Sequence, residues 1–276
     1  MAVIKFNFLS ETLMQQANVT LCLPVHGFAD TMKGVDAAQY YRDGLKYQTL
    51  WLLHGGSGDD SDYVNFSNIA RYAEEHKVAV VCPSDYNQYY TNDIRGGARY
   101  FDYIVDELPT VLRGLFPLAS AREDNFIGGL SMGGCGAFKC AIARPDLYGS
   151  ALIMSGSILS KQWLETRYQN GGNFALFSRL GDPADFENGP DDMWSLAAKH
   201  AADGTQMPDF YMSVGSEDFT LGVMRESYEY IKGLGFNIPV YEEVPGLRHE
   251  WKLWDRTLEK ALDEWLPVRN EPVYKY

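Results

Sequence analysis

The chain has few cysteines, no long apolar run and no excess of basic residues. Four cysteines among 276 residues, with no Cys-x-x-Cys pair, give little basis for a disulfide scaffold or for a zinc or redox site. No apolar run approaches the roughly 20 residues that cross a bilayer. The N-terminus also lacks the charged segment and long apolar stretch of a signal peptide. We therefore expect no metal site, no membrane span and a cytoplasmic location.

The charge balance argues against a nucleic-acid partner. The formal net charge is -13, whereas phosphate backbones are held by clustered Lys and Arg. Hydrophobic residues make up 46% and charged residues 22% of the chain, which is typical of a globular enzyme. The length suits one large α/β domain better than two independent ones.

Short apolar runs alternate with segments of helical periodicity along the chain. Predicted strands cover about 3–9, 19–23, 50–53, 78–81, 126–130, 151–154, 210–214 and 238–244, and predicted helices cover 63–76, 101–115, 135–143 and 251–265. The first two strands should pair antiparallel. The later alternation predicts a mostly parallel central sheet flanked by helices, within a single domain over residues 1–276. Residues 156–208 are too long for a plain connection and predict an inserted cap-like segment over the sheet, or a structural helical pair packed on one side.

A nucleophile-elbow pattern stands at the centre of the chain. In Gly129-Leu130-Ser131-Met132-Gly133, a serine lies between a predicted strand and a predicted helix, with glycines two positions before and two after it. Glycines are needed there because larger side chains would collide with the neighbouring strand and helix. The pattern predicts Ser131 as the nucleophile of an acyl-transfer enzyme.

A serine nucleophile needs a base, and the base needs an orienting acid. Of the two histidines after Ser131, His249 lies in the loop between the last strand and the last helix, whereas His200 falls in a helical pattern of the insertion. We predict His249 as the base. The loop after the preceding strand offers Asp218 as the acid, with Glu217 as its competitor.

Two backbone N–H groups are expected to bind the oxyanion. One belongs to Met132, directly after the nucleophile, and the other to Gly56, in the loop after the strand at 50–53. His54 in the same loop is interpreted as a bracing residue rather than a catalyst.

These motifs together resemble the esterase D / tributyrin esterase family of the α/β-hydrolases, which is related to feruloyl esterases and S-formylglutathione hydrolases. The resemblance rests on Leu52-Leu53-His54-Gly55, Ser57-Gly58-Asp59, the elbow, Gly215-Ser216-Glu217-Asp218-Phe219 and His249-Glu250-Trp251, and it runs through nearly the whole chain. It implies an α/β-hydrolase fold, the triad Ser131, Asp218 and His249, an oxyanion hole at Gly56 and Met132, and no cofactor. Gly56 departs from the family, which often has a bulky residue there.

We therefore predict a serine carboxylesterase that hydrolyses short-chain acyl esters through an acyl-enzyme. A feruloyl or cinnamoyl esterase is the first alternative, followed by an S-formylglutathione hydrolase-type thioesterase and a catalytically silent binding module. The partner is a small-molecule ester, and a homo-oligomer is among the expectations because relatives are frequently oligomeric. The residues expected to touch substrate are Ser57, Tyr89, Tyr90, Trp163 and Trp251.

Overall fold

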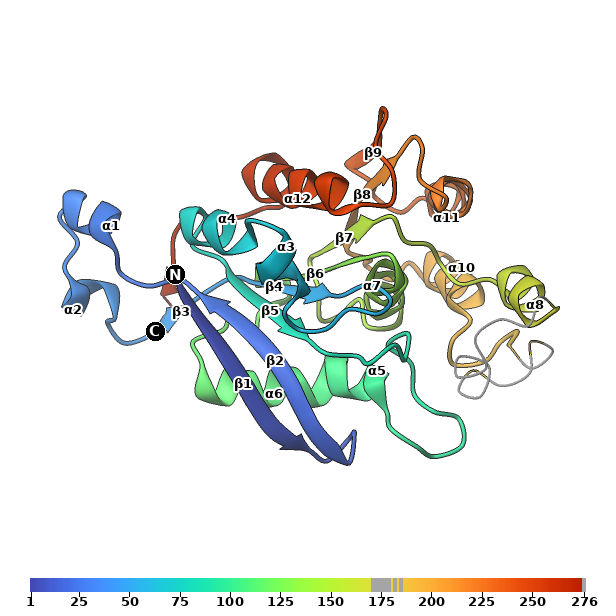
Figure 1. Ribbon diagram of the computed structural model, residues 1–276, viewed down its shortest axis with the longest axis horizontal. Helices are drawn as coiled ribbons and strands as arrows, with labels where there is room; N and C mark the ends of the chain where they lie inside the picture. Colours follow the sequence, from blue (N-terminus) through green and yellow to red (C-terminus); the bar gives the residue numbers. More distant parts are fainter. Residues whose placement is uncertain (170–179, 181–182, 184–185, 275–276) are drawn as a thin grey trace.

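An eight-stranded sheet forms the centre of the computed structural model, which describes residues 1–169, 180, 183 and 186–274 (Figure 1). Its strand order is β1-β2-β5-β4-β6-β7-β8-β9. The strands are β1 Ala2–Ser10, β2 Gln15–Leu23, β4 Thr49–Leu53, β5 Ala79–Pro83, β6 Asn125–Leu130, β7 Ser150–Met154, β8 Asp209–Gly215 and β9 Val240–Val244. β1, β2 and β5 pair antiparallel, and the remaining ladders are parallel. The predicted α/β class with an antiparallel start is confirmed.

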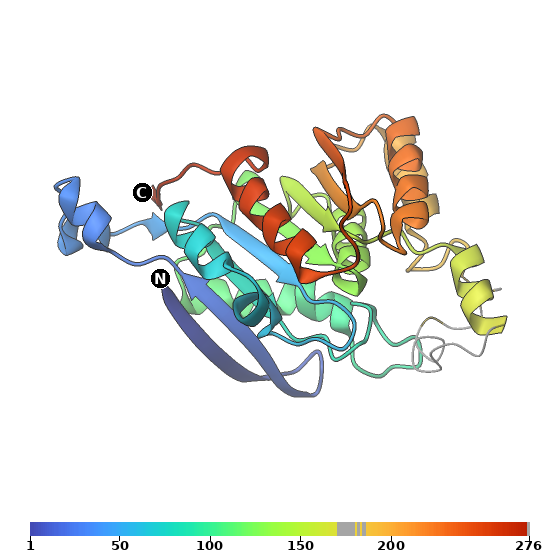
Figure 2. The same cartoon turned by 45° about the horizontal axis from the view of Figure 1, so that its top comes forward.

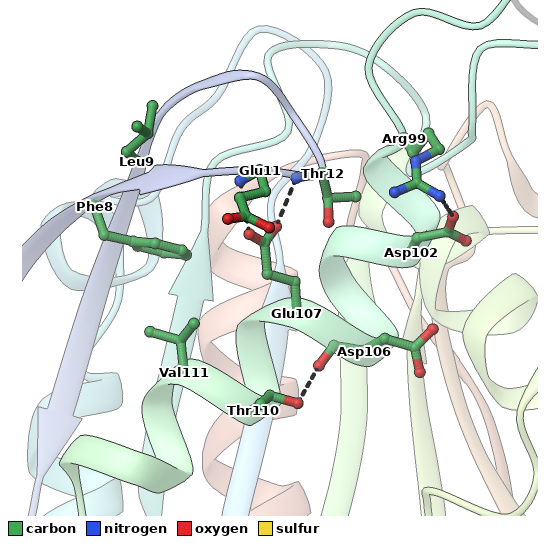
Figure 3. A pocket seen from close by; sticks show the side chains of 10 residues that line it. All are labelled: Phe8, Leu9, Glu11, Thr12, Arg99, Asp102, Asp106, Glu107, Thr110 and Val111. Carbon is green, nitrogen blue, oxygen red and sulfur yellow. Dashed lines mark hydrogen bonds and ion pairs between the residues drawn. The ribbon is translucent and has the colours of Figure 1, made fainter.

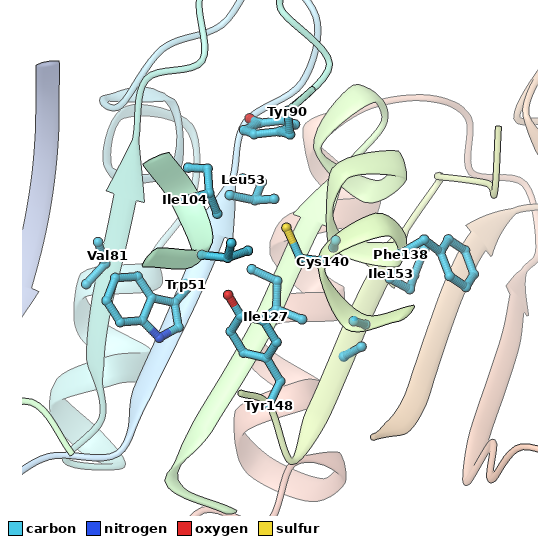
Figure 4. Close-up of a cluster of buried hydrophobic side chains, with 14 of the residues drawn as sticks. Trp51, Leu53, Val81, Tyr90, Ile104, Ile127, Phe138, Cys140, Tyr148 and Ile153 are labelled. Atoms are coloured by element: carbon cyan, nitrogen blue, oxygen red, sulfur yellow. The ribbon is translucent and has the colours of Figure 1, made fainter. Parts of the chain in front are cut away.

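Helices cover both faces of this sheet, as Figures 1 and 2 show. They include α4 Ile69–Glu75, α6 Leu108–Leu115, α7 Met132–Ala143, α11 Leu221–Gly233 and α12 Trp251–Lys260. Along β4, Leu50 and Leu52 pack into the apolar layer under α4 and α12, whereas Trp51 and Leu53 pack into the layer under α6 and α7. Successive side chains of a strand point to opposite faces, so a continuously apolar strand fits a sheet that is covered on both sides. Figure 4 shows part of the second layer, which includes Trp51, Leu53, Ile127 and Phe138.

The helix predicted over 251–265 is α12 continued by the π-helical segment η4 Ala261–Trp265. Three further segments differ from the structure. The helix predicted over 63–76 is two helices, α3 Asp62–Phe66 and α4, because Ser67 adopts an extended conformation that interrupts the hydrogen-bond ladder. The helix predicted over 101–115 consists of α5 Tyr100–Asp102, the π-helical segment η1 Tyr103–Glu107 and α6. The irregular winding directly precedes Pro109, which has no N–H to donate.

The third difference is the connection at 25–44, where no strand or helix is predicted. It contains the short helices α1 Phe28–Met32 and α2 Ala37–Tyr40 and leads into β3 Leu45–Lys46. β3 pairs with β10 Val273–Tyr274 in a separate two-stranded sheet. α1 and α2 project from the body of the protein in both views.

The insertion expected at 156–208 lies between β7 and β8. Its described helices are α8 Lys161–Gln169 and α10 Met193–Asp203, and the part at 170–179, 181–182 and 184–185 lies outside the described residues. The Lys139 ammonium of α7 forms a buried ion pair with Asp191, just before α10. The insertion is thus attached to the helix that follows the elbow.

The parallel arrangement determines where functional side chains gather. The loops that carry His54, Ser131, Ser155, Asp218 and His249 follow β4, β6, β7, β8 and β9, so they converge at one edge of the sheet, where α/β proteins bind their ligands. Across the described ranges, no helix combines the length and apolar character needed to traverse a bilayer.

Candidate active site

Ser131 occupies a strained turn between β6 and α7. Its φ of 54° and ψ of -118° lie outside the regions that a non-glycine residue normally adopts. A Cβ at Gly129 would lie 2.1 Å from the Gly133 carbonyl oxygen, and a Cβ at Gly133 would lie 1.9 Å from the Leu53 carbonyl oxygen. Only glycine fits at either position, because both close contacts are with backbone. The turn is therefore fixed by its two glycines, as the sequence predicts.

The Ser131 hydroxyl lies next to the imidazole of His249. Nε2 of His249 is 2.8 Å from Ser131 Oγ, and Nδ1 is 3.0 and 3.1 Å from the two carboxylate oxygens of Asp218. A carboxylate only accepts hydrogen bonds, so Nδ1 carries the proton and Nε2 is free to accept that of Ser131. The three residues have the relative positions of a nucleophile, a base and an orienting acid.

Asp218 is held as an ionised acceptor. Its Oδ1 receives hydrogen bonds of 2.8 Å from both the backbone N–H and the hydroxyl of Thr220. Burial by itself raises the pKa of Asp218, but hydrogen bonds from His249, Thr220 and Ser155 outweigh burial and bring the pKa below its ordinary value. Its competitor Glu217 is exposed and pairs instead with Arg248 at 3.0 Å.

The loops that carry Asp218 and His249 are joined to each other. The Glu217 N–H donates to the Leu247 carbonyl at 3.0 Å, and the Gly246 N–H donates to the Ser216 hydroxyl at 2.9 Å. A Cβ at Gly215 would lie 2.1 Å from the same Leu247 carbonyl oxygen, so this approach needs glycine. The bonded loops fix the distance between acid and base.

The two backbone groups expected to bind an oxyanion lie beside Ser131. Gly56 and Met132 line the same pocket as the serine hydroxyl. Met132 is the first residue of α7, so its N–H has no acceptor within the helix, and the helix dipole adds positive potential there. The loop that carries Gly56 is fixed by a side chain outside it, because the Ser57 N–H donates to Asn87 Oδ1 at 2.5 Å.

His54 and Tyr90 brace the loop after β4. His54 Nε2 accepts the Asp85 N–H at 2.8 Å, which leaves Nδ1 to donate to the Gly55 carbonyl at 2.7 Å. Burial lowers the pKa of His54, so the ring is neutral. Tyr90 is fully buried and donates its hydroxyl to the His54 carbonyl at 2.8 Å. The bracing interpretation of His54 agrees with this geometry, whereas Tyr90, expected to touch substrate, belongs to the support of the loop.

A pocket of about 200 Å³ opens beside Ser131. Its lining comprises Gly56, Tyr89, Ser131, Met132, Cys135, Ser155, Gly156, Ser157, Trp163, Phe219, Thr220 and Val223. Tyr89 and Trp163 are therefore placed where the sequence suggested, and their rings are 6.2 Å apart.

Ser57 and Trp251 lie outside this lining. The Trp251 ring packs on Tyr63, Phe66 and Trp254. Sequence reasoning did not find Phe219, which is 75% exposed and whose ring centroid is 4.3 Å from that of His249. Its position beside Asp218 in sequence is the only signal that pointed to it.

Other candidate places lack this chemistry. His200 lies in α10, where its Nδ1 contacts the Thr205 hydroxyl at 3.1 Å, away from the elbow. A larger hollow of about 580 Å³ lies where the β1–β2 turn meets η1 (Figure 3). There Glu107 accepts hydrogen bonds from Ser10 and from the backbone of Glu11, so it secures the hairpin. In the described parts of the chain, no group of three or more His, Cys, Asp or Glu is arranged to hold a metal ion.

The sheet topology and the Ser–His–Asp geometry define a serine hydrolase of the α/β-hydrolase fold. The profile of the family described as "Putative esterase" matches residues 34–264, and the chain belongs to that family. It is accordingly a carboxylic ester hydrolase.

Individual relatives cover almost the entire chain. An acetyl esterase of Caldicellulosiruptor saccharolyticus is 29% identical over 270 residues, which cover 96% of this chain and 98% of the relative. The substrate-bound structure of fluorophosphonate-binding serine hydrolase F from Staphylococcus aureus superposes with a TM-score of 0.82, at 28% identity, over 96% of this chain and 98% of that one. An S-formylglutathione hydrolase of the same organism gives a TM-score of 0.78, also at 28% identity, with the same coverage.

Proposed function

We propose that the protein hydrolyses short-chain acyl esters through an acyl-enzyme formed on Ser131. The observation that carries this proposal is the 2.8 Å contact between Ser131 Oγ and His249 Nε2, with Nδ1 of the same ring on Asp218. The acetyl esterase relative supports the choice of a short acyl group.

In the first half-reaction, Ser131 Oγ attacks the ester carbonyl carbon while His249 Nε2 takes the hydroxyl proton. The carbonyl oxygen becomes an oxyanion, which the N–H groups of Gly56 and Met132 stabilise. His249 then gives its proton to the departing alcohol oxygen as the carbon–oxygen bond breaks. Asp218 holds the imidazole in the required tautomer and stabilises the imidazolium.

In the second half-reaction, water takes the place of the alcohol. His249 removes a proton from the water, the resulting hydroxide attacks the acyl carbon, and the proton passes to Ser131 Oγ as the acid leaves. Apart from that water, both halves use the side chains and backbone groups described above.

The dimensions of the pocket support short acyl groups. Its volume of about 200 Å³ is below the roughly 300–1,000 Å³ of pockets for drug-sized ligands. Trp163 of α8 and Tyr89 contact each other and form part of the lining. We also propose that residues 156–208 act as a cap, since Trp163 reaches the pocket and Asp191 is tied to α7 by the ion pair with Lys139.

An aromatic-acid esterase is the second candidate, because three aromatic side chains stand among the described residues of the lining: Tyr89, Trp163 and Phe219. A feruloyl or cinnamoyl group would stack on such rings. A thioesterase for glutathione conjugates has less support, since none of the described residues that line the pocket carries a charge to pair with an anionic peptide.

Hydrolysis of p-nitrophenyl esters from acetyl to dodecanoyl, with methyl ferulate and S-formylglutathione alongside, separates these candidates. The proposal expects the highest kcat/KM on acetyl or butyryl esters. A higher value on methyl ferulate would favour the second candidate, and one on S-formylglutathione would favour the thioesterase. No turnover of any of them would contradict the proposed function.

A further inference from the structure

Ser155 is a strained, fully buried serine at the end of β7. Its φ is 51°, a left-handed conformation that is uncommon for a residue with a side chain. Its N–H donates to the Ser213 carbonyl of β8 at 2.9 Å. The next residue, Gly156, packs against α7, where an added Cβ would lie 2.6 Å from the Gly134 Cα. The surrounding backbone therefore imposes this conformation, and strain that is held in this way is common at functional sites.

The partners of the Ser155 hydroxyl are a tryptophan and the triad acid. Trp254 Nε1 donates to Ser155 Oγ at 3.0 Å. An indole N–H is only a donor, so this bond makes the serine oxygen the acceptor and leaves the hydroxyl proton for another partner. The acceptor on offer is the Asp218 carboxylate, and a hydrogen bond from Ser155 is among the causes that hold the pKa of Asp218 below its ordinary value.

Trp254 also contacts the base. Its ring meets the His249 ring edge to face, with centroids 5.0 Å apart and planes at 89°. Trp254 is only 6% exposed and lies in the first turn of α12, directly after the loop of His249. One side chain thus touches the imidazole with its ring and reaches the acid through Ser155.

Thr220 alone leaves the carboxylate incompletely held. Both hydrogen bonds from Thr220 go to the same oxygen, Oδ1, and both come from the loop that carries Asp218 itself. A donor on a different strand restrains rotation of the carboxylate about its Cβ–Cγ bond, which Thr220 does not do alone. Ser155 on β7 supplies that donor, and Trp254 on α12 orients it.

We propose that Ser155 and Trp254 are positioning residues that hold the Asp218 carboxylate against His249 Nδ1. The proposal rests on the proposed esterase function. In this role Ser155 makes no contact with the reacting atoms. Loss of its hydroxyl should therefore lower kcat rather than weaken binding of the ester.

Two variants of Ser155 separate positioning from stability. Ser155→Gly and Ser155→Ala both remove the hydroxyl, but glycine adopts a φ of 51° without strain, so the glycine variant should melt at a higher temperature than the alanine variant. We expect both to lower kcat for p-nitrophenyl acetate by about tenfold, the effect of one hydrogen bond to a charged group. KM should change less than about twofold. If the less stable variant instead loses more kcat than the more stable one, the effect reflects stability and the proposal is wrong.

A double-mutant cycle tests whether Trp254 acts through Ser155. Trp254→Phe keeps an aromatic ring beside His249 and removes the indole donor, and we expect kcat to fall about threefold from the loss of one neutral hydrogen bond. In a Ser155→Gly background the same substitution should have no further effect on kcat. Additive losses would contradict the assignment.

Ser213→Ala is the matched control. Ser213 is equally buried, and its hydroxyl bonds Thr257 of α12 at 3.0 Å, so it joins a strand to the same helix without touching Asp218. Its kcat should equal that of the unaltered protein. If the unaltered protein hydrolyses no ester, the proposed function fails and this proposal fails with it. If the unaltered protein is active and Ser155→Gly matches its kcat, only the positioning role is wrong.

Discussion

The imidazole Nε2 of His249 lies 2.8 Å from the hydroxyl of Ser131, although 118 positions separate the two residues in the chain. The loop after β6 presents the serine and the loop after β9 presents the histidine. Parallel strands bring both loops to the same edge of the sheet. The glycines of the elbow permit the tight turn on which the serine lies. The contact is thus a consequence of strand order and of a few positions at which only glycine fits.

His249→Ala should lower kcat for p-nitrophenyl acetate by at least about 10³-fold, because Ser131 then has no base. In a Ser131→Ala background the same change should add almost nothing, since the members of a triad act as a unit. Steady-state kinetics on the two single variants and the double variant measure this. Independent losses that multiply would mean that His249 does not act on Ser131.

Acid should destabilise the fold partly through Asp218. Burial raises the pKa of this carboxyl, but hydrogen bonds from His249, Thr220 and Ser155 lower it further, so the folded pKa lies below the unfolded value of about 3.9. Such a group stabilises the fold above the unfolded pKa, and this stabilisation is lost as the pH falls through the folded pKa.

Asp218→Asn removes that contribution. Below about pH 5 its free energy of unfolding should decline less steeply with acidification than that of the unaltered protein. Urea unfolding at several pH values between 7 and 3 gives both slopes. Equal slopes would show that Asp218 has the same pKa in the folded and unfolded chains.

Gly133→Ala should destabilise the protein by at least about 2 kcal/mol, because the new Cβ would lie 1.9 Å from the Leu53 carbonyl oxygen and backbone must move. Gly114→Ala is a matched control in an exposed turn of α6, with nothing within 4 Å of the added atom. It should stabilise by about 0.5–1 kcal/mol, since alanine loses less conformational entropy in a helix. Similar unfolding midpoints for the two variants would contradict this account of the elbow.

The elbow and its partners were predictable because each lies in a short, recognisable sequence motif. The glycines around Ser131 and the loop positions of Asp218 and His249 can be read directly from short motifs. No such motif identifies the lining of the pocket, because the lining depends on which loops fold over the serine. Tyr90 turned out to be buried beneath the loop of His54, and Phe219 was overlooked although its ring contacts His249.

Substrate preference should depend on Trp163. Trp163→Ala removes an aromatic ring that lines the pocket and contacts Tyr89, so longer acyl chains gain room. We expect the ratio of kcat/KM for p-nitrophenyl octanoate to that for the acetate to rise about tenfold. Trp251→Ala alters a tryptophan outside the pocket and should leave the ratio unchanged. A ratio that moves equally in both variants would remove Trp163 from the acyl site.

The most direct test of the central claim is the reaction of p-nitrophenyl acetate with the unaltered protein and with Ser131→Ala, followed by peptide mass spectrometry of the quenched enzyme. The account predicts turnover and an acetyl group on Ser131 in the unaltered protein, with turnover reduced at least about 10³-fold and no acetylated elbow peptide in the variant. Undiminished hydrolysis by Ser131→Ala, or acetylation at a different residue during turnover, would contradict it.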